Sequence, residues 1–153
     1  IVYRRGVPVA GVAQPEAVID RLFARNGWGN SWVNGIYNFQ HYHATVHEVL
    51  GIARGRGSVQ FGGPEGRILE IEAGDVVIIP AGVGHCRLAS KGLSVVGAYP
   101  QGSSSIDLRR ANAADLAGAA ELIARVPLPP SDPVHGRDGP LPKIWRSILS
   151  APP

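Results

Sequence analysis

The middle of the chain alternates short hydrophobic runs, rich in Val, Ile and aromatic residues, with breaks that contain Gly, Pro or Asn. Such side chains suit a pleated, half-buried surface, so these runs predict β-strands. Gly62-Gly63-Pro64 and Ala73-Gly74-Asp75 are typical of turns between strands. So many short strands favour an all-β barrel or double-sheet jelly roll. About eight strands are expected, near residues 33–39, 40–46, 48–54, 57–62, 67–72, 75–79, 85–89 and 93–99.

A helix is predicted ahead of the strands, at residues 15–26. Pro15 suits a first helical turn, and Gly27 is a common left-handed stop. We expect the helix to pack on the outside of the sheet, against Trp28 and Trp32. Its apolar stripe recurs at helical spacing in Ile19, Leu22 and Phe23.

The chain after the strands predicts a second amphipathic helix and then an extended tail. The helix covers residues 112–125, with Asn112 as its N-cap and Asp115 in its first turn. From Val126 onward the sequence is rich in Pro, which argues against a further helix. We expect this tail to lie extended over the barrel or over a neighbouring subunit.

Length and composition are compatible with one domain that contains all of these elements. The chain has 153 residues, of which 44% are hydrophobic and 18% charged, as in ordinary globular proteins rather than disordered ones. We therefore expect a single domain over residues 1–153. Its expected parts are a barrel core at about 32–100, an N-terminal helix at about 15–26, and a C-terminal helix at about 112–125 with the Pro-rich tail.

The charge pattern argues against nucleic-acid and membrane partners. The net charge is only +3, and the arginines occur as scattered pairs rather than as a dense basic run. The longest apolar stretch, residues 76–84, is interrupted by Pro80 and is too short to cross a bilayer. The single cysteine, Cys86, excludes an intramolecular disulfide, so a cytoplasmic location is expected.

Four of the five histidines fall in two short windows, and the first of these predicts half of a metal site. It reads GIYNFQHYHATVHEVLGIARG, from Gly35 to Gly55. His41 and His43 lie two positions apart, so on a strand both imidazoles point to the same side. Glu48 follows on the next strand and shares parity with the apolar residues of that strand. Burying its carboxylate is costly unless a cation compensates the charge, which a divalent metal ion would do.

The acidic ligand has an alternative in its neighbour. Glu48 follows His43 after four intervening residues, and His47 follows it after three. Parity with Leu50 and Ile52 favours Glu48, but a bulge could slip the register and bring His47 to the site instead.

The second window, GDVVIIPAGVGH, supplies a further ligand. Gly74-Asp75 turns the chain, Pro80 ends the buried strand, and His85 opens the next strand, so that it can point into the same cavity. Three imidazoles and one carboxylate suit one divalent transition metal ion, such as Fe, Mn, Ni, Co, Cu or Zn, rather than Ca or Mg. In octahedral geometry, two adjacent positions would remain for water or substrate.

These two windows resemble the two motifs of the cupin superfamily at every spacing through His85. The one departure is Ala89, where the family often has Asn, and this position is not a ligand. The stretches NGIYNFQHYH, VHEVLG, PAGVGH and VVGAYP are similar to single-domain bacterial cupins of the YjlB-like type, over about residues 26–101 and more loosely in DPVHGRDGPLPKIW. The resemblance implies a double-stranded β-helix, the cupin jelly-roll barrel, with His41, His43, Glu48 and His85 as metal ligands, but no particular reaction.

Three further residues are candidates for substrate binding. Arg87 shares strand parity with His85, so it either points into the cavity, where it would bind an anion, or lies at the barrel mouth. Tyr37 and Phe39 share parity with His41 and are expected to line the interior, as core packing or as pocket walls.

Two classes of function fit this pattern. The first is a small metalloenzyme, of dioxygenase or isomerase/lyase type, that acts on a small organic molecule with Glu48, or alternatively His47, as a catalytic proton carrier. The second is a metal- or ligand-binding protein without turnover, such as a sensor. A homodimer is expected in either case, because a second subunit can cover an open sheet edge.

Overall fold

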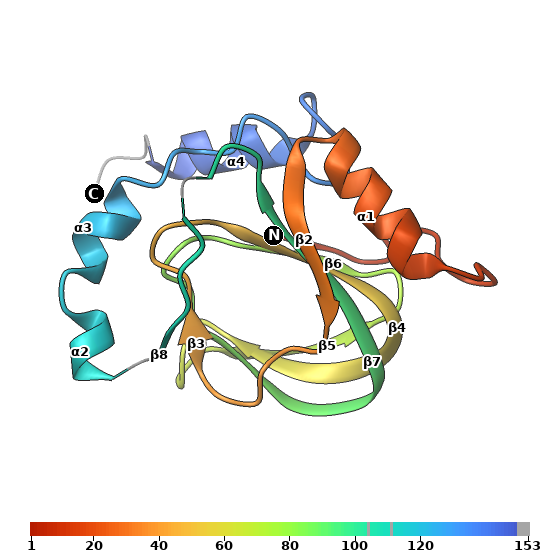
Figure 1. The fold of residues 1–153 in the computed structure, drawn as a ribbon, viewed down its shortest axis with the longest axis horizontal. Coiled ribbons are helices and arrows are strands. Elements are labelled where there is room, and N and C mark those ends of the chain that lie inside the picture. The colour runs from red at the N-terminus through yellow and green to blue at the C-terminus, as the bar shows by residue number, and fades with distance from the viewer. Residues whose placement is uncertain (104, 111, 150–153) are drawn as a thin grey trace.

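The computed structural model describes residues 1–103, 105–110 and 112–149, with the side chain of Leu149 excepted, and its fold is all-β with short flanking helices (Figure 1). Every strand pairing is antiparallel, in the order β1-β6-β4-β7-β3-β8, with β2 added to β7 and β5 added to β4. The predicted all-β fold is thus confirmed. The strands are β1 Val2–Tyr3, β2 Trp28–Asn34, β3 His41–Tyr42, β4 Glu48–Phe61, β5 Arg67–Glu72, β6 Val76–Ile79, β7 His85–Pro100 and β8 Arg109–Arg110.

Two long strands, β4 and β7, form the frame of the barrel. The sequence pattern predicts a break in each of them, near residues 55–56 and 90–92, and this prediction is wrong because both strands run on through those positions. Gly55 allows the continuity: it adopts a φ of +70°, and a Cβ there would lie 2.3 Å from the carbonyl oxygen of Gly92. The pair can therefore bend sharply without losing its ladder.

The segment before the first histidine is a loop rather than the predicted strand at residues 33–39. β2 ends at Asn34, whose Oδ1 accepts a hydrogen bond from the backbone N–H of Gly35. The chain then crosses from β2 to β3, and two hydrogen bonds from Arg87 of β7 hold it: the backbone N–H donates to the carbonyl of Tyr37, and Nε donates to the carbonyl of Ile36. β3 itself has only two residues, so most of the predicted strand at residues 40–46 is also loop.

Helix α1 (Pro15–Arg25) lies across the outside of the sheet, as predicted. Its Ile19 and Phe23 are fully buried in one core cluster with Trp28. Gly51 of β4 makes room for them, since a Cβ there would lie 2.5 Å from Cγ2 of Ile19. Trp32 does not join this cluster and packs against the second core inside the barrel, which corrects its predicted position.

The C-terminal part differs most from the prediction. The predicted helix at 112–125 is divided into α2 (Ala113–Leu116) and α3 (Ala119–Ala124) by Gly118, which has a φ of +69°. The Pro-rich tail contains a third, unpredicted helix, α4 (Pro140–Leu149). Proline is tolerated at the start of α4 because residues in the first turn of a helix donate no backbone hydrogen bond within the helix. The helix is held by burial of Leu141 and Trp145 against the outer core.

The two cores lie on opposite sides of the sheet. The outer core lies under α1 and α4, and the inner core fills the barrel with aliphatic side chains from β4, β5, β6 and β7. The inner core does not extend to the end of the barrel near β3, and polar side chains lie there instead. Among the described residues, no helix combines the length and apolarity needed to cross a bilayer.

Candidate metal centre

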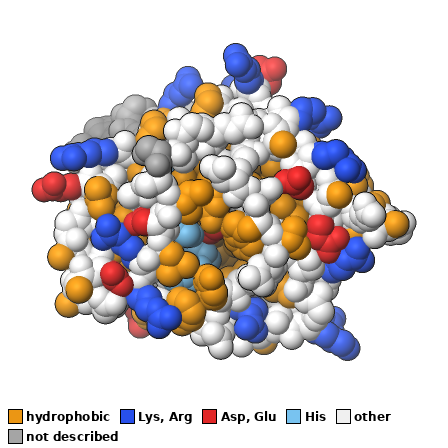
Figure 2. Space-filling model, in the orientation of Figure 1, with side chains coloured by type: hydrophobic (Ala, Val, Ile, Leu, Met, Phe, Trp, Pro, Cys, Tyr) orange, Lys and Arg blue, Asp and Glu red, His pale blue; other side chains and the backbone are white. Residues whose placement is uncertain are grey.

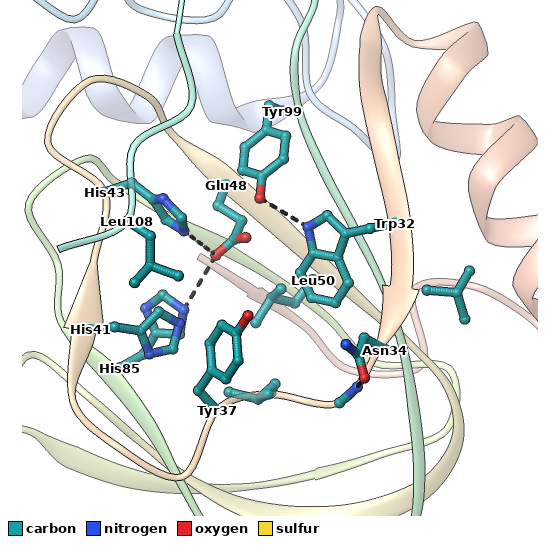
Figure 3. Close-up of a pocket in the computed structure, with 13 residues that line it drawn as sticks. Trp32, Asn34, Tyr37, His41, His43, Glu48, Leu50, His85, Tyr99 and Leu108 are labelled. Carbon is teal, nitrogen blue, oxygen red and sulfur yellow. Dashed lines mark hydrogen bonds and ion pairs between the residues drawn. The ribbon is translucent and has the colours of Figure 1, made fainter. Parts of the chain in front are cut away.

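Three histidines converge at the open end of the barrel (Figure 3). His41 lies on β3 and is the register partner of His85, the first residue of β7, while His43 comes directly after β3. One nitrogen from each ring can be chosen so that all three lie within 4.8 Å of one another. His41, His43 and His85 are 4%, 7% and 1% exposed, so all three are buried. The three imidazoles therefore form a cluster that could hold a metal ion.

Glu48, the first residue of β4, extends its carboxylate into the same cluster. Its Oε2 lies 3.5 Å from Nε2 of His43 and 3.3 Å from Nε2 of His85. Neither contact has hydrogen-bond geometry, and this buried oxygen has no hydrogen-bond partner. An unsatisfied buried carboxylate oxygen is costly, and a cation between it and the imidazoles would remove the cost. The donor set thus fits a divalent metal ion.

Backbone carbonyls orient the three rings. His41 and His85 each donate from Nδ1 to the carbonyl two residues earlier, at 3.0 and 3.3 Å, and His43 donates from Nδ1 to the carbonyl of Asp107. Because a carbonyl can only accept, Nδ1 carries the hydrogen in each ring and Nε2 is the nitrogen free to bind a metal.

Electrostatics prepares two of these groups for cation binding at neutral pH. Burial, and then the nearby His85, lower the pKa of His41 from 6.5 to about 4, so its imidazole is neutral. Burial alone would raise the pKa of Glu48, but contacts with His43 and His85 outweigh it and lower the pKa to about 2. The same partnership with Glu48 outweighs burial at His43 and raises its pKa.

His47 lies outside the cluster. Its Nδ1 accepts a hydrogen bond of 2.9 Å from the backbone N–H of Ala81, and its ring meets the edge of Trp145 on α4. Burial lowers its pKa to about 4. Of the two alternatives for the acidic ligand, the structure brings Glu48 to the histidines and packs His47 behind the sheet.

The cluster forms the floor of a cavity of about 280 Å³. Figure 2 shows histidine side chains at the bottom of a hollow that hydrophobic side chains surround. Trp32 and Tyr99 form part of its wall, and the indole Nε1 donates a hydrogen bond of 2.9 Å to the Tyr99 hydroxyl. Sequence reasoning missed both residues. Tyr99 could have been found from its parity with Val95, which lies in the inner core.

Tyr37 lines the cavity and is half exposed at its mouth. Phe39 stacks on Tyr37 with ring centroids 4.9 Å apart, and the guanidinium carbon of Arg110 lies 4.1 Å above its ring. Phe39 is not among the lining residues, so of the two aromatic side chains only Tyr37 is placed to touch a ligand directly.

Arg87 is placed at the barrel mouth rather than in the cavity. It pairs with Val59 and shares the inward face by register, but its Nε donates to the carbonyl of Ile36 and its Nη1 to Ser90 Oγ. These bonds hold the guanidinium in a separate surface pocket, and residues 34–37 border both that pocket and the cavity.

Comparisons with known proteins agree with this architecture. The sequence model of the family described as Cupin matches residues 34–114. An uncharacterized protein, YjlB of Bacillus subtilis (strain 168), is 37% identical over 146 residues, which cover 95% of this chain and 84% of that protein.

Solved structures that match part of this chain include an acireductone dioxygenase from Bacillus anthracis with a cadmium ion in its active centre. It is 20% identical, with a TM-score of 0.42, over 57% of this chain and 60% of that one. An oxalate decarboxylase from Bacillus subtilis with Mn(II) centres is 19% identical, with a TM-score of 0.42, over 53% of this chain and 23% of that one. The matched part therefore spans less than two thirds of either solved chain.

Proposed function

The chain belongs to the cupin family as a YjlB-like member, and from this premise we propose that it is a small metalloenzyme that acts on a small organic molecule. The observation that carries the proposal is the buried, unpartnered Oε2 of Glu48, which faces Nε2 of His43 and His85. His41, His43, His85 and Glu48 would hold one divalent transition metal ion, for which three imidazoles and a carboxylate are suitable ligands. When bound, the ion would supply Lewis-acid or redox chemistry at the floor of the cavity.

Above its floor, the lining of the cavity favours the apolar part of a ligand. Among the described residues that line it, none is Lys or Arg, and Leu50 and Leu108 contribute apolar wall. A volume of about 280 Å³ is at the low end of ligand sites. We therefore expect a small, largely apolar substrate whose polar atoms are directed at the floor.

Two side chains are placed to handle hydrogen bonds and protons in this cavity. The Tyr99 hydroxyl accepts from Trp32, so its own hydrogen remains available to donate to Glu48 or to a substrate oxygen. Glu48 is ionised at neutral pH and could accept a proton from a bound substrate. Tyr37, at the mouth, would contact the part of the substrate nearest to solvent.

Metal content tests the site itself. We expect protein prepared without a His-tag to hold about one transition metal ion per chain, and the His41→Ala variant to lose most of it. His135→Ala is the matched control, because His135 is exposed and lies outside the cluster. Full metal content in His41→Ala, measured by mass spectrometry of the metals, would show that the site is assigned wrongly.

Turnover tests the enzyme. Fe(II)- or Mn(II)-loaded protein is assayed with small acids, enols and thiols, with and without dioxygen, which separates dioxygenase from isomerase or lyase chemistry. Glu48→Gln keeps the shape of the side chain but removes its charge, and we expect it to abolish turnover. A fully loaded protein that turns over none of these compounds would instead support a non-catalytic metal- or ligand-binding role.

A further inference from the structure

The three cluster histidines are held by acceptors of different origin. The carbonyls that orient His41 and His85 lie two residues before each ring, within the same local chain segment. The carbonyl that orients His43 belongs to Asp107, on a distant segment that runs beside β3. His43 is thus the one member of the cluster whose orientation depends on a long-range contact.

The side chain of Asp107 fixes that segment in place. Its Oδ1 accepts hydrogen bonds from the backbone N–H of Ala44 at 2.9 Å, the N–H of Thr45 at 3.0 Å and the Thr45 hydroxyl at 2.8 Å. Its Oδ2 accepts from Nε of Arg109 at 2.7 Å. The carboxylate therefore grips the two residues that directly follow His43, while the carbonyl of the same residue holds the His43 ring.

We propose that Asp107 is a positioning residue for the metal centre: its carboxylate locks residues 105–110 against residues 43–45, so that its carbonyl holds His43 with Nε2 directed at the cluster. The inference rests on the metal site proposed above. Leu108, the next residue, lines the cavity, so the same lock also sets part of the cavity wall. Partners that orient a metal-binding imidazole typically change metal affinity by about 10- to 100-fold when they are removed.

Two substitutions separate the lock from general folding. Asp107→Ala removes all four side-chain hydrogen bonds, and we expect the dissociation constant for Mn(II) or Co(II) to rise at least about tenfold. Asp107→Asn keeps an oxygen that can accept from Ala44 and Thr45, so its affinity should stay within a few-fold of wild type. Affinity is measured by competition with a chelator, and the EPR spectrum of bound Mn(II) reports changed ligand geometry.

Asp75→Ala is the matched control. Asp75 is fully buried, whereas Asp107 is partly buried, and it also accepts from two backbone N–H groups, those of Arg5 and Glu72, but it lies away from the cavity. We expect this variant to lose stability while its folded fraction keeps wild-type metal affinity. If Asp107→Ala binds metal as tightly as wild type, or if Asp75→Ala loses the same affinity, the lock does not position the site.

A second readout needs no metal. In long-range proton–nitrogen NMR spectra of the metal-free protein, recorded well above neutral pH, wild-type His43 should carry its hydrogen on Nδ1. Asp107→Ala should show a mixture of the two tautomers, and an unchanged Nδ1–H form would overturn the inference. Failure of wild type to bind any metal would refute the proposed metal site, while this readout would still decide the role of Asp107.

Discussion

Replacing Gly97 by Ala tests how tightly the Trp32 indole is fixed in the cavity wall. Trp32 of β2 and Gly97 of β7 are register partners, and the indole occupies the space beside the glycine. A Cβ at position 97 would lie 2.1 Å from Cε2 and Cζ2 of the indole. Ordinary contact between carbon atoms needs about 3.5–4.0 Å, so the ring would have to move by about 1.5 Å. That movement would break its 2.9 Å hydrogen bond to Tyr99.

These contacts set the size of the expected effect. Overpacking of this kind costs about 1–3 kcal/mol, and loss of the hydrogen bond adds about 1 kcal/mol. We expect Gly97→Ala to lower the free energy of unfolding by about 2–4 kcal/mol in urea denaturation. Gly29→Ala on β2 is the matched control: a Cβ there meets Gln101 at 3.5 Å, an ordinary contact, and should cost less than about 0.5 kcal/mol.

A double-mutant cycle identifies the cause. In a Trp32→Ala background the clash is gone, so Gly97→Ala should have little effect there. An equal loss of stability in both backgrounds would refute the reasoning, because the strain would then come from something other than the indole.

Two further predictions concern the outer face of the sheet, where His47 packs against Trp145 and Gly51 against α1. The lowered pKa of His47 means that the unfolded chain binds more protons than the folded one between about pH 6.5 and 4, so stability of the metal-free protein should fall as pH falls through this window. His47 should contribute about 3 kcal/mol of that fall. The variant His47→Asn, which can still accept from Ala81, should show a shallower dependence of stability on pH. An unchanged dependence would show that His47 is not its source. Gly51→Ala would place a Cβ 2.5 Å from Ile19 and 2.9 Å from Phe23, both fully buried, and should cost about 1–3 kcal/mol in urea unfolding. Normal stability in that variant would mean that α1 can move off the sheet.

Local signals in the sequence were sufficient to predict an element where the residues at its ends are themselves typical of a start or a stop. The predicted helix at 15–26 matches α1 to within one residue, because Pro15 and Gly27 mark its ends independently of the rest of the fold. The strand content was also predictable from β-branched runs. The predicted breaks in β4 and β7 were wrong because a glycine such as Gly55 can bend a paired strand as well as end it.

Elements that depend on distant packing were not predictable in this way. Helix α4 forms in a Pro-rich tail because burial of Leu141 and Trp145 stabilises it, and no local pattern reports that burial. Arg87 has the inward parity that was expected, yet a hydrogen bond to the carbonyl of Ile36 holds it at the mouth. Trp32 and Tyr99 meet only because β2 pairs with β7.

The sequence alone predicted which residues would supply a metal site. Spacing by two puts His41 and His43 on one side of the chain, and strand parity favours Glu48 over His47, since both depend only on backbone periodicity. The tertiary structure decided where those donors meet. Pairing of β3 with β7 brings His41 beside His85, and the grip of Asp107 on residues 44 and 45 orients His43. Such contacts follow from strand register and loop closure, which a one-dimensional pattern does not encode.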